Sequence, residues 1–167
     1  MSNCIHVTSL DGEQTEAVAR AFAGLLAPGC IVSLEGDLGA GKTFFTRALL
    51  RQLGVTDRVT SPTFVLQKAY RLPGGPVDAL VHYDLYRIDS YEELLEIGFE
   101  EMLDGNASFV EWGGKFCAEY PVPAIRIDFT VTGPDSRGIR ICSGELPGAE
   151  AFVEALAREG IEARPAG

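Results

Sequence analysis

An eight-residue stretch, Gly36-Asp37-Leu38-Gly39-Ala40-Gly41-Lys42-Thr43, constrains the fold of this chain more than any other feature. It fills every fixed position of the pattern G-x-x-x-x-G-K-S/T, the P-loop. The apolar run 30–35 before it is typical of a buried strand, and residues 44–53 after it carry apolar side chains at helical spacing. Strand, glycine loop and helix in this order predict an α/β domain that binds the phosphates of a nucleotide.

The residue types of this loop suit phosphate chemistry. Its glycines let the backbone approach a ligand closely, and the amides and dipole of the following helix attract negative charge. Lys42 would reach the β- and γ-phosphates, and the hydroxyl of Thr43 would ligate Mg²⁺. We therefore predict a nucleoside triphosphate with Mg²⁺ as the ligand, and these residues leave the choice between adenine and guanine open.

Composition and charge narrow the class of protein. Hydrophobic residues make up 46% and charged residues 23% of the 167 residues, as in ordinary soluble domains. The net charge of −10 argues against strong direct binding to nucleic acid or to an anionic membrane. The chain has neither a basic-then-apolar N-terminal segment nor a long apolar run, so we expect it to be cytoplasmic.

The four cysteines are dispersed along the chain, at Cys4, Cys30, Cys117 and Cys142. They form no C-x-x-C pair and have no ligand-like spacing to either histidine. In a reducing cytosol such cysteines remain reduced. We therefore predict four free thiols.

The rest of the sequence predicts a single P-loop domain over residues 1–160 and a frayed tail over 161–167. Two Pro/Gly turns between extended runs predict β-hairpins, which require antiparallel neighbours. The fold class is therefore α/β, with a mixed central sheet flanked by helices. The expected elements are a strand at 5–7, a helix begun by Asp11 as N-cap, a hairpin of 64–72 with 77–83, a helix at 91–103, a strand at 106–112, a hairpin of 125–132 with 137–143, and a helix at 149–158.

Two carboxylates close apolar strands, where ligands bind in open α/β sheets. Asp84 ends the run 80–83, and Glu111 ends the run 107–110. Each can hold Mg²⁺, directly or through water, or orient an attacking water. The alternative for each is an ordinary carboxylate at the end of a strand.

Other polar residues accompany these strands. Ser61-Pro62-Thr63 follows the P-loop by about 20 residues and suits a loop that senses the γ-phosphate, although a rigid turn is the alternative. Arg87 is either a stabiliser of transition-state charge or a surface arginine. Trp112 is either a core residue or a contact to nucleotide or partner. For His82, on the same strand face as Asp84, we favour a structural hydrogen bond over catalysis.

With the P-loop, three further segments resemble the TsaE family, also called YjeE. These small bacterial P-loop ATPases support synthesis of the N6-threonylcarbamoyladenosine modification of tRNA. The segments are Ser61-Pro62-Thr63-Phe64, His82-Tyr83-Asp84-Leu85-Tyr86-Arg87 and Val110-Glu111-Trp112, in the family's order and at compatible spacing. The resemblance covers residues 5–145 and implies ATP and Mg²⁺ as ligands.

The resemblance also implies roles for individual residues. Glu111 is similar to the second acid at the magnesium site, Asp84 to an essential aspartate that shares in metal binding, and Ser61 with Thr63 to a switch loop. The implied catalytic set is Lys42, Thr63, Asp84 and Glu111. The implied nucleotide contacts are Gly36 to Thr43, Ser61, Trp112, Arg137 near the phosphates, and Asp11 and Thr15 near the adenine.

In the family, TsaD and TsaB perform the threonylcarbamoyl transfer, and the ATPase depends on that heterodimer. We therefore expect weak hydrolysis by this chain alone, activation by the pair, and contact with tRNA only through the complex. Thr60 and the turn 73–76 depart from the family's pattern. One alternative is a small-molecule kinase. Such enzymes usually carry an arginine-rich lid over the phosphates, whereas Arg87 and Lys115 are the only arginine or lysine residues between Leu72 and Arg126, which disfavours this interpretation. The other alternative is a nucleotide-gated adaptor with little catalysis.

Overall fold

The apolar run before the P-loop forms β2 (Ile31–Glu35), an interior strand of an eight-stranded sheet, in a computed structural model that describes residues 3–166. Predictions that fall on Met1, Ser2 and Gly167 lie outside these residues. β2 pairs in parallel with β5 (Ala107–Glu111) and β6 (Ile125–Val131), and β5 pairs in parallel with β4 (Ala79–Asp84). β2, β4 and β5 are buried almost throughout because both faces of the sheet are covered there, whereas β6 alternates buried apolar residues with more exposed ones.

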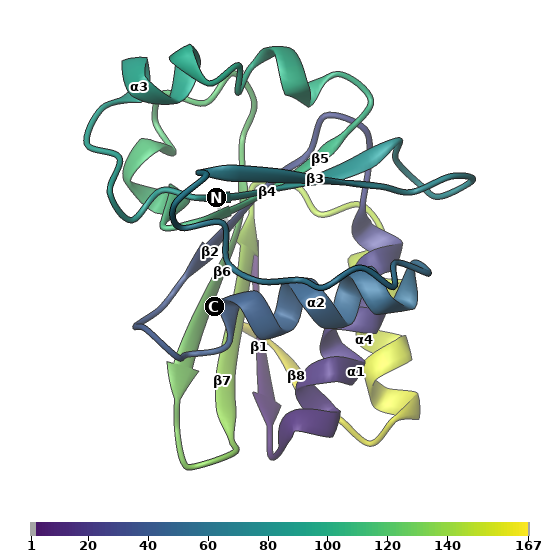
Figure 1. The fold of residues 1–167 in the computed structure, drawn as a ribbon. Coiled ribbons are helices and arrows are strands. Elements are labelled where there is room, and N and C mark those ends of the chain that lie inside the picture. The colour runs from purple at the N-terminus through teal and green to yellow at the C-terminus, as the bar shows by residue number, and fades with distance from the viewer. Residues whose placement is uncertain (1–2, 167) are drawn as a thin grey trace.

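The outer strands are antiparallel to their neighbours. β3 (Gln67–Arg71) pairs with β4, and β7 (Arg137–Ser143) pairs with β6, which confirms both hairpins. β1 (Asn3–Ser9) lies between β7 and β8 (Ala163–Ala166). The sheet order is β3-β4-β5-β2-β6-β7-β1-β8 (Figure 1), so the prediction of a mixed sheet flanked by helices is confirmed.

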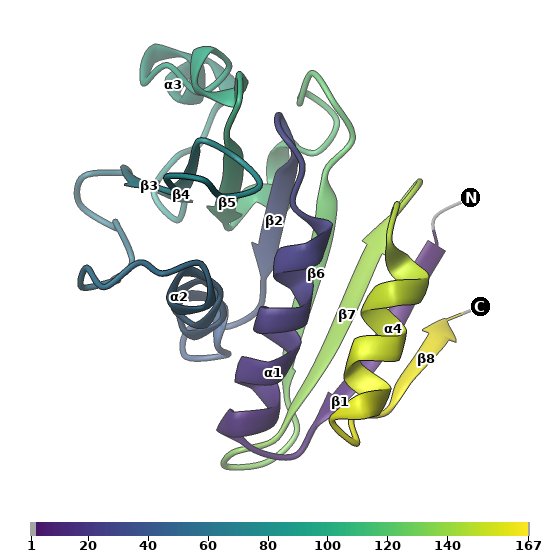
Figure 2. The same cartoon turned by 90° about the vertical axis from the view of Figure 1, so that its right-hand side faces the viewer.

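Three helices cover one face of the sheet: α1 (Gly12–Phe22), α2 (Lys42–Gln52) and α4 (Ala149–Arg158), as Figure 2 shows. A short 3₁₀ turn, Ala23–Leu25, extends α1. Phe22 lies at the centre of the core on this face, with edge-to-face contacts to Phe45, Phe109 and Phe152. The core therefore ties α1 to α2, to β5 and to α4.

The opposite face carries shorter elements around a second apolar cluster that includes Val81, Tyr83 and Val110. Over it lie α3 (Tyr91–Glu96) and the 3₁₀ turns Glu101–Leu103 and Gly113–Phe116. The predicted helix over 91–103 is wrong beyond Glu96. Gly98 follows the helix end with φ of 80°, a left-handed conformation that stops an α-helix.

The start of α1 was predicted correctly. The carboxylate of Asp11 accepts a hydrogen bond from the amide of Gln14 at 2.9 Å, and the Gln14 side chain accepts one from the amide of Leu10 at 2.9 Å. The first bond satisfies an amide that the first helical turn leaves free, and the second ties the residue before the N-cap to the helix.

The prediction of a frayed tail is wrong for residues 163–166. These residues form β8 and pair with β1 in an antiparallel register that sets Val7 opposite Ala163. Strand pairing of this kind satisfies the backbone of a terminal segment, which local composition does not reveal. Within residues 3–166, no helix is both long enough and apolar enough to cross a membrane.

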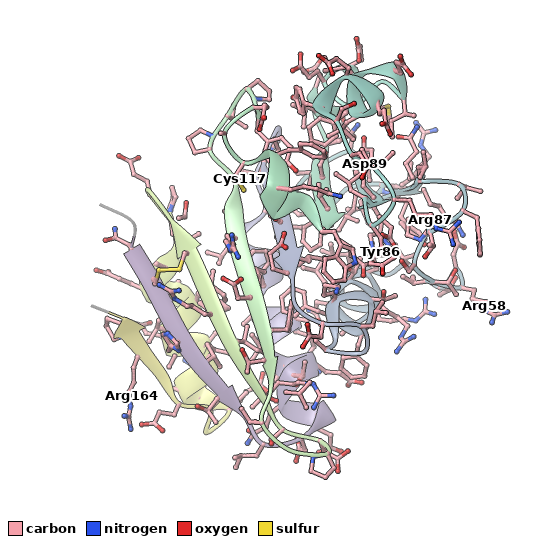
Figure 3. The ribbon with its side chains drawn as sticks, turned by 90° about the vertical axis from the view of Figure 1, so that its left-hand side faces the viewer. Arg58, Tyr86, Arg87, Asp89, Cys117 and Arg164 are labelled. Atoms are coloured by element: carbon pink, nitrogen blue, oxygen red, sulfur yellow. A yellow bond between two sulfur atoms is a disulfide. The ribbon has the colours of Figure 1, made fainter. Side chains whose placement is uncertain are left out.

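The prediction of four free thiols is also wrong. Antiparallel pairing of β1 with β7 sets Cys4 opposite Cys142, with 4.1 Å between their Cα atoms, and the two are joined by a disulfide (Figure 3). The two residues are 138 positions apart, so their sequence spacing carried no sign of the pair. Cys30 and Cys117 are free thiols.

We expect Cys142→Ser to lower the free energy of unfolding by about 2–4 kcal/mol under non-reducing conditions, because the bridge restricts the unfolded chain. Urea unfolding followed by circular dichroism measures this difference. In excess dithiothreitol the difference from the unsubstituted protein should vanish. Cys117→Ser, at an exposed free thiol, is the matched control and should leave the midpoint unchanged. Equal midpoints without reductant would contradict the structural role of the bridge.

Candidate nucleotide-binding site

The P-loop joins the end of β2 to the start of α2, and two of its glycines are required by geometry. Gly36 has φ of 144°, and a Cβ there would lie 2.7 Å from the carbonyl oxygen of Phe129. Gly41 has φ of 116° and precedes the first helical residue. The amide of Phe45 donates to the carbonyl of Gly41, so the amides before it in α2 face the loop rather than the helix. This cradle suits a phosphate.

Lys42 is the cation at the centre of this cradle. Its side chain is only 5% exposed, and Nζ donates to the carbonyls of Gly36 and, at 3.3 Å, Asp37. The ammonium also lies 3.8 Å from the ring centroid of Trp112. Burial lowers the pKa of Lys42, an effect opposed by the charges of nearby carboxylates, first among them Glu111. A poorly solvated cation of this kind gains strongly from an incoming phosphate.

Glu111 lies beside Thr43 at the end of β5. The Thr43 hydroxyl is 3.0 and 3.2 Å from the two carboxylate oxygens of Glu111, which is itself 4% exposed. Nε2 of His82 lies 2.5 Å from Glu111 Oε2. The hydroxyl and the carboxylate supply hard oxygen ligands of the type that Mg²⁺ prefers.

Asp84 is brought next to Glu111 by the sheet. β4 and β5 pair in parallel with Asp84 opposite Glu111, as expected of two carboxylates at strand ends. Asp84 Oδ2 accepts hydrogen bonds from Ser61 at 2.5 Å and Thr63 at 2.9 Å, and Oδ1 accepts one from the amide of Tyr86 at 3.0 Å. The loop 61–63 is thereby held at the same strand end.

These residues surround one cavity of about 310 Å³. Within the described residues, no cluster of three or more His, Cys, Asp or Glu side chains could hold a metal by itself. The pair Thr43 and Glu111 therefore fits Mg²⁺ that takes its remaining ligands from phosphate and water, as this ion usually does beside a nucleotide. The cavity is lined by Leu38, Gly39, Gly41, Lys42, Thr43, Phe44, Arg47, Ser61, Thr63, Asp84, Glu111 and Trp112.

Six predicted nucleotide contacts are not part of the cavity lining: Asp11, Thr15, Gly36, Asp37, Ala40 and Arg137. Nε of Arg137 donates to the carbonyl of Ala40 at 2.9 Å, so this side chain holds the P-loop backbone in place. Asp11 and Thr15 do not line the cavity; Asp11 caps α1, and the Thr15 hydroxyl is buried 2.6 Å from that of Ser9. Their approach to the adenine stays a prediction.

Sequence reasoning missed two residues that line the cavity from α2. Phe44 and Arg47 lie one helical turn apart, and the Arg47 guanidinium is 5.5 Å from the Phe44 ring centroid. The signal was available, because positions i and i+3 share a helix face and Phe44 directly follows the P-loop. Tyr86, whose ring centroid is 5.3 Å from that of Trp112, flanks the same site and lies on the side of the molecule shown in Figure 3.

The fold and the site together define a P-loop protein of the α/β class. A model of the family "Threonylcarbamoyl adenosine biosynthesis protein TsaE" matches residues 9–139. The chain belongs to the TsaE family. Every residue that lines the cavity lies within the matched range.

Individual relatives agree with this membership. A curated TsaE protein of Rickettsia bellii is 40% identical over 126 residues, which cover 75% of this chain and 85% of the relative. A curated TsaE protein of Bacillus subtilis is 36% identical over 132 residues, which cover 78% of this chain and 80% of the relative. The crystal structure of Bacillus subtilis YdiB superposes with a TM-score of 0.70 at 31% identity, covering 96% of this chain and 98% of that one.

We expect Lys42→Ala to weaken nucleotide binding by about 10- to 100-fold, because a hydrogen bond to a charged group contributes about 1.5–3 kcal/mol. Trp112 is the single tryptophan and contacts Lys42, so its fluorescence during titration with ADP measures the affinity. Arg158→Ala, which removes an exposed cation on α4, is the control and should bind ADP normally. Unchanged affinity in Lys42→Ala would exclude phosphate contact by this side chain.

Proposed function

We propose that this protein is a cytoplasmic Mg²⁺-dependent ATPase that acts in the threonylcarbamoyladenosine modification of tRNA. The observation that carries the ATPase proposal is the convergence of Lys42, Thr43, Asp84 and Glu111 on one cavity at the ends of β2, β4 and β5. Membership of the TsaE family supports the place of this activity in tRNA modification.

The proposed reaction is hydrolysis of the bond between the β- and γ-phosphates. The oxygen of a water forms a bond to the γ-phosphorus while the bridging oxygen leaves with ADP, and the water's proton passes to solvent with the phosphate product. Lys42 and the P-loop amides balance the phosphate charge. Thr43 and Glu111 would hold Mg²⁺, whose chemistry is to polarise phosphate oxygens.

Asp84 has the features of a group that orients the attacking water. Its carboxylate is fixed by Ser61, Thr63 and the amide of Tyr86, so its remaining lone pairs keep a defined direction. This role differs from that of Glu111, because Asp84 contacts the loop 61–63 and Glu111 contacts the P-loop threonine. We assign Asp84 mainly to turnover and Glu111 mainly to the metal.

The cations around the site support dependence on partners. Rapid phosphoryl transfer needs positive charge at the γ-phosphate in the transition state, often an arginine. Arg137 is committed to backbone carbonyls of residues 40, 133 and 136. The other two arginines near the site are exposed and lie beside aromatic rings: Arg47 of the cavity lining is 5.5 Å from the Phe44 ring centroid, and Arg87 is 5.3 Å from that of Phe64. We propose that the TsaD–TsaB pair completes the site, and that tRNA meets this chain only through that complex.

The apolar rim of the site is consistent with such an encounter. Phe64, which directly follows the loop 61–63, is 85% exposed, and Leu38 of the P-loop is 77% exposed. Exposed apolar side chains next to a binding cavity are a common feature of protein contact surfaces. The net charge of −10 favours a protein over nucleic acid at this rim.

We expect Asp84→Ala to reduce ATP turnover at least 10-fold in the presence of purified TsaD and TsaB, while ATP affinity changes by less than about 3-fold. The reason is that orientation of water matters in the transition state and not in the bound ground state. Steady-state phosphate release gives kcat and KM. Asp89→Ala, which changes an exposed carboxylate (Figure 3), is the control. Loss of ATP binding with intact turnover at saturation would refute this role.

The same assay separates the alternatives. The protein alone should hydrolyse ATP slowly, and the TsaD–TsaB pair should raise the rate and support threonylcarbamoyladenosine formation in tRNA. ADP release that requires a specific small acceptor, and not the pair, would establish a kinase. Normal tRNA modification by Glu111→Ala, with loss of complex assembly in Lys42→Ala, would establish an adaptor without catalysis.

A further inference from the structure

We propose that His82 is a positioning residue that aims the Glu111 carboxylate at the metal and keeps it away from Lys42. The inference rests on the proposed function, since Glu111 needs to be aimed only if a magnesium–nucleotide complex binds. Nothing in the role of His82 requires it to touch the nucleotide.

The side chain of His82 has one polar contact and no exposure. It is 0% exposed on β4, and its Nε2 lies 2.5 Å from Glu111 Oε2. A carboxylate that binds a metal is deprotonated and only accepts hydrogen bonds, so a metal-binding Glu111 requires Nε2 to be the donor of this contact. Nδ1 is buried and has no partner among the described residues. An unpaired buried nitrogen is unfavourable, and an apolar residue would pack at this position without that cost, so the contact to Glu111 is the benefit that a histidine brings.

The sheet explains why this histidine reaches Glu111. Side chains alternate along a strand, so His82 and Asp84 point to one face while Val81 and Tyr83 join the apolar cluster on the other. In the parallel register His82 stands opposite Phe109, and Asp84 stands opposite Glu111. Glu111 is thus held by groups from two different elements, Thr43 on α2 and His82 on β4.

Glu111 has a competing partner in the buried ammonium of Lys42. Among the carboxylates that raise the pKa of Lys42, Glu111 has the largest effect, yet no ion pair joins the two within the described residues. If His82 no longer binds Oε2, the carboxylate has Thr43 as its remaining hydrogen-bond partner and can turn toward Lys42. Such a turn would withdraw an oxygen from the metal and neutralise the cation that binds phosphate. Partners that orient metal ligands commonly affect metal affinity by about 10- to 100-fold.

The test measures binding rather than catalysis. Calorimetry gives the affinity for adenylyl imidodiphosphate in EDTA and in saturating MgCl₂, and the ratio of the two is the gain due to Mg²⁺. We expect His82→Leu, which cannot donate, to reduce this gain at least 10-fold. His82→Gln, whose amide can donate to Glu111, should retain it within about 3-fold. Ser108→Ala is the matched control, because this buried β5 hydroxyl has no partner within residues 3–166 and is not part of the cavity lining.

A double-mutant cycle separates positioning from a structural role. In a Glu111→Gln background, His82→Leu should cause no further loss of the Mg²⁺ gain, because the carboxylate that His82 aims is already absent. A merely structural histidine would lower the melting temperature and leave the gain unchanged when Glu111 is present. A further loss in the Glu111→Gln background would show that His82 acts by a route other than Glu111 and would overturn the inference. If His82→Leu does not fold, His82→Asn, whose amide ends short of the Nε2 position, takes its place with the same expected loss.

The outcomes distinguish this inference from the proposed function. If the unsubstituted protein binds the analogue no more tightly with Mg²⁺ than in EDTA, the proposed magnesium-dependent function fails. If it shows the gain, and His82→Leu or its Asn substitute shows the same gain, the positioning role of His82 is overturned while the proposed function stands.

Discussion

The parallel pairing of β2 with β5, and of β5 with β4, is the constraint on which the site depends. It brings the ends of three strands to one edge, directly below the start of α2. Each strand contributes one component there: the P-loop follows β2, Glu111 ends β5, and Asp84 ends β4. A shift of one residue in either pairing would turn a carboxylate to the opposite face of the sheet, since side chains alternate.

The charges gathered at this edge are buried, so their mutual arrangement decides what the site can do. Burial lowers the pKa of Lys42, and the surrounding carboxylates oppose that effect. The two carboxylates have different hydrogen-bond partners. Asp84 accepts from the hydroxyls of Ser61 and Thr63. Glu111 is bound by Thr43 and His82. Because each carboxylate has its own hydrogen-bond donors, neither forms an ion pair with Lys42 within the described residues. The phosphate cradle and the oxygen ligands thus remain available to a magnesium–nucleotide complex.

Much of the fold and most of the site could be predicted from local pattern. The strand–loop–helix unit, both hairpins, the capping of α1 by Asp11 and the bounds of α4 were predicted correctly because each depends on residues close together in the chain. The strand-end rule identified Asp84 and Glu111. The helix over 91–103 was wrong because the turn at Gly98 breaks a pattern that periodicity alone would continue.

The sequence by itself determined the TsaE-type P-loop class and predicted the ligand and the residues of the candidate site, because the P-loop motif and the strand-end carboxylates express their chemistry within a few residues. Only the tertiary structure decided which of these groups meet. Asp84 beside Glu111, His82 bound to Glu111, Cys4 bridged to Cys142 and the C-terminal residues paired with β1 all depend on strand register. Register is set by packing of the whole sheet, so contacts between residues about 30 to 160 positions apart leave no local signal.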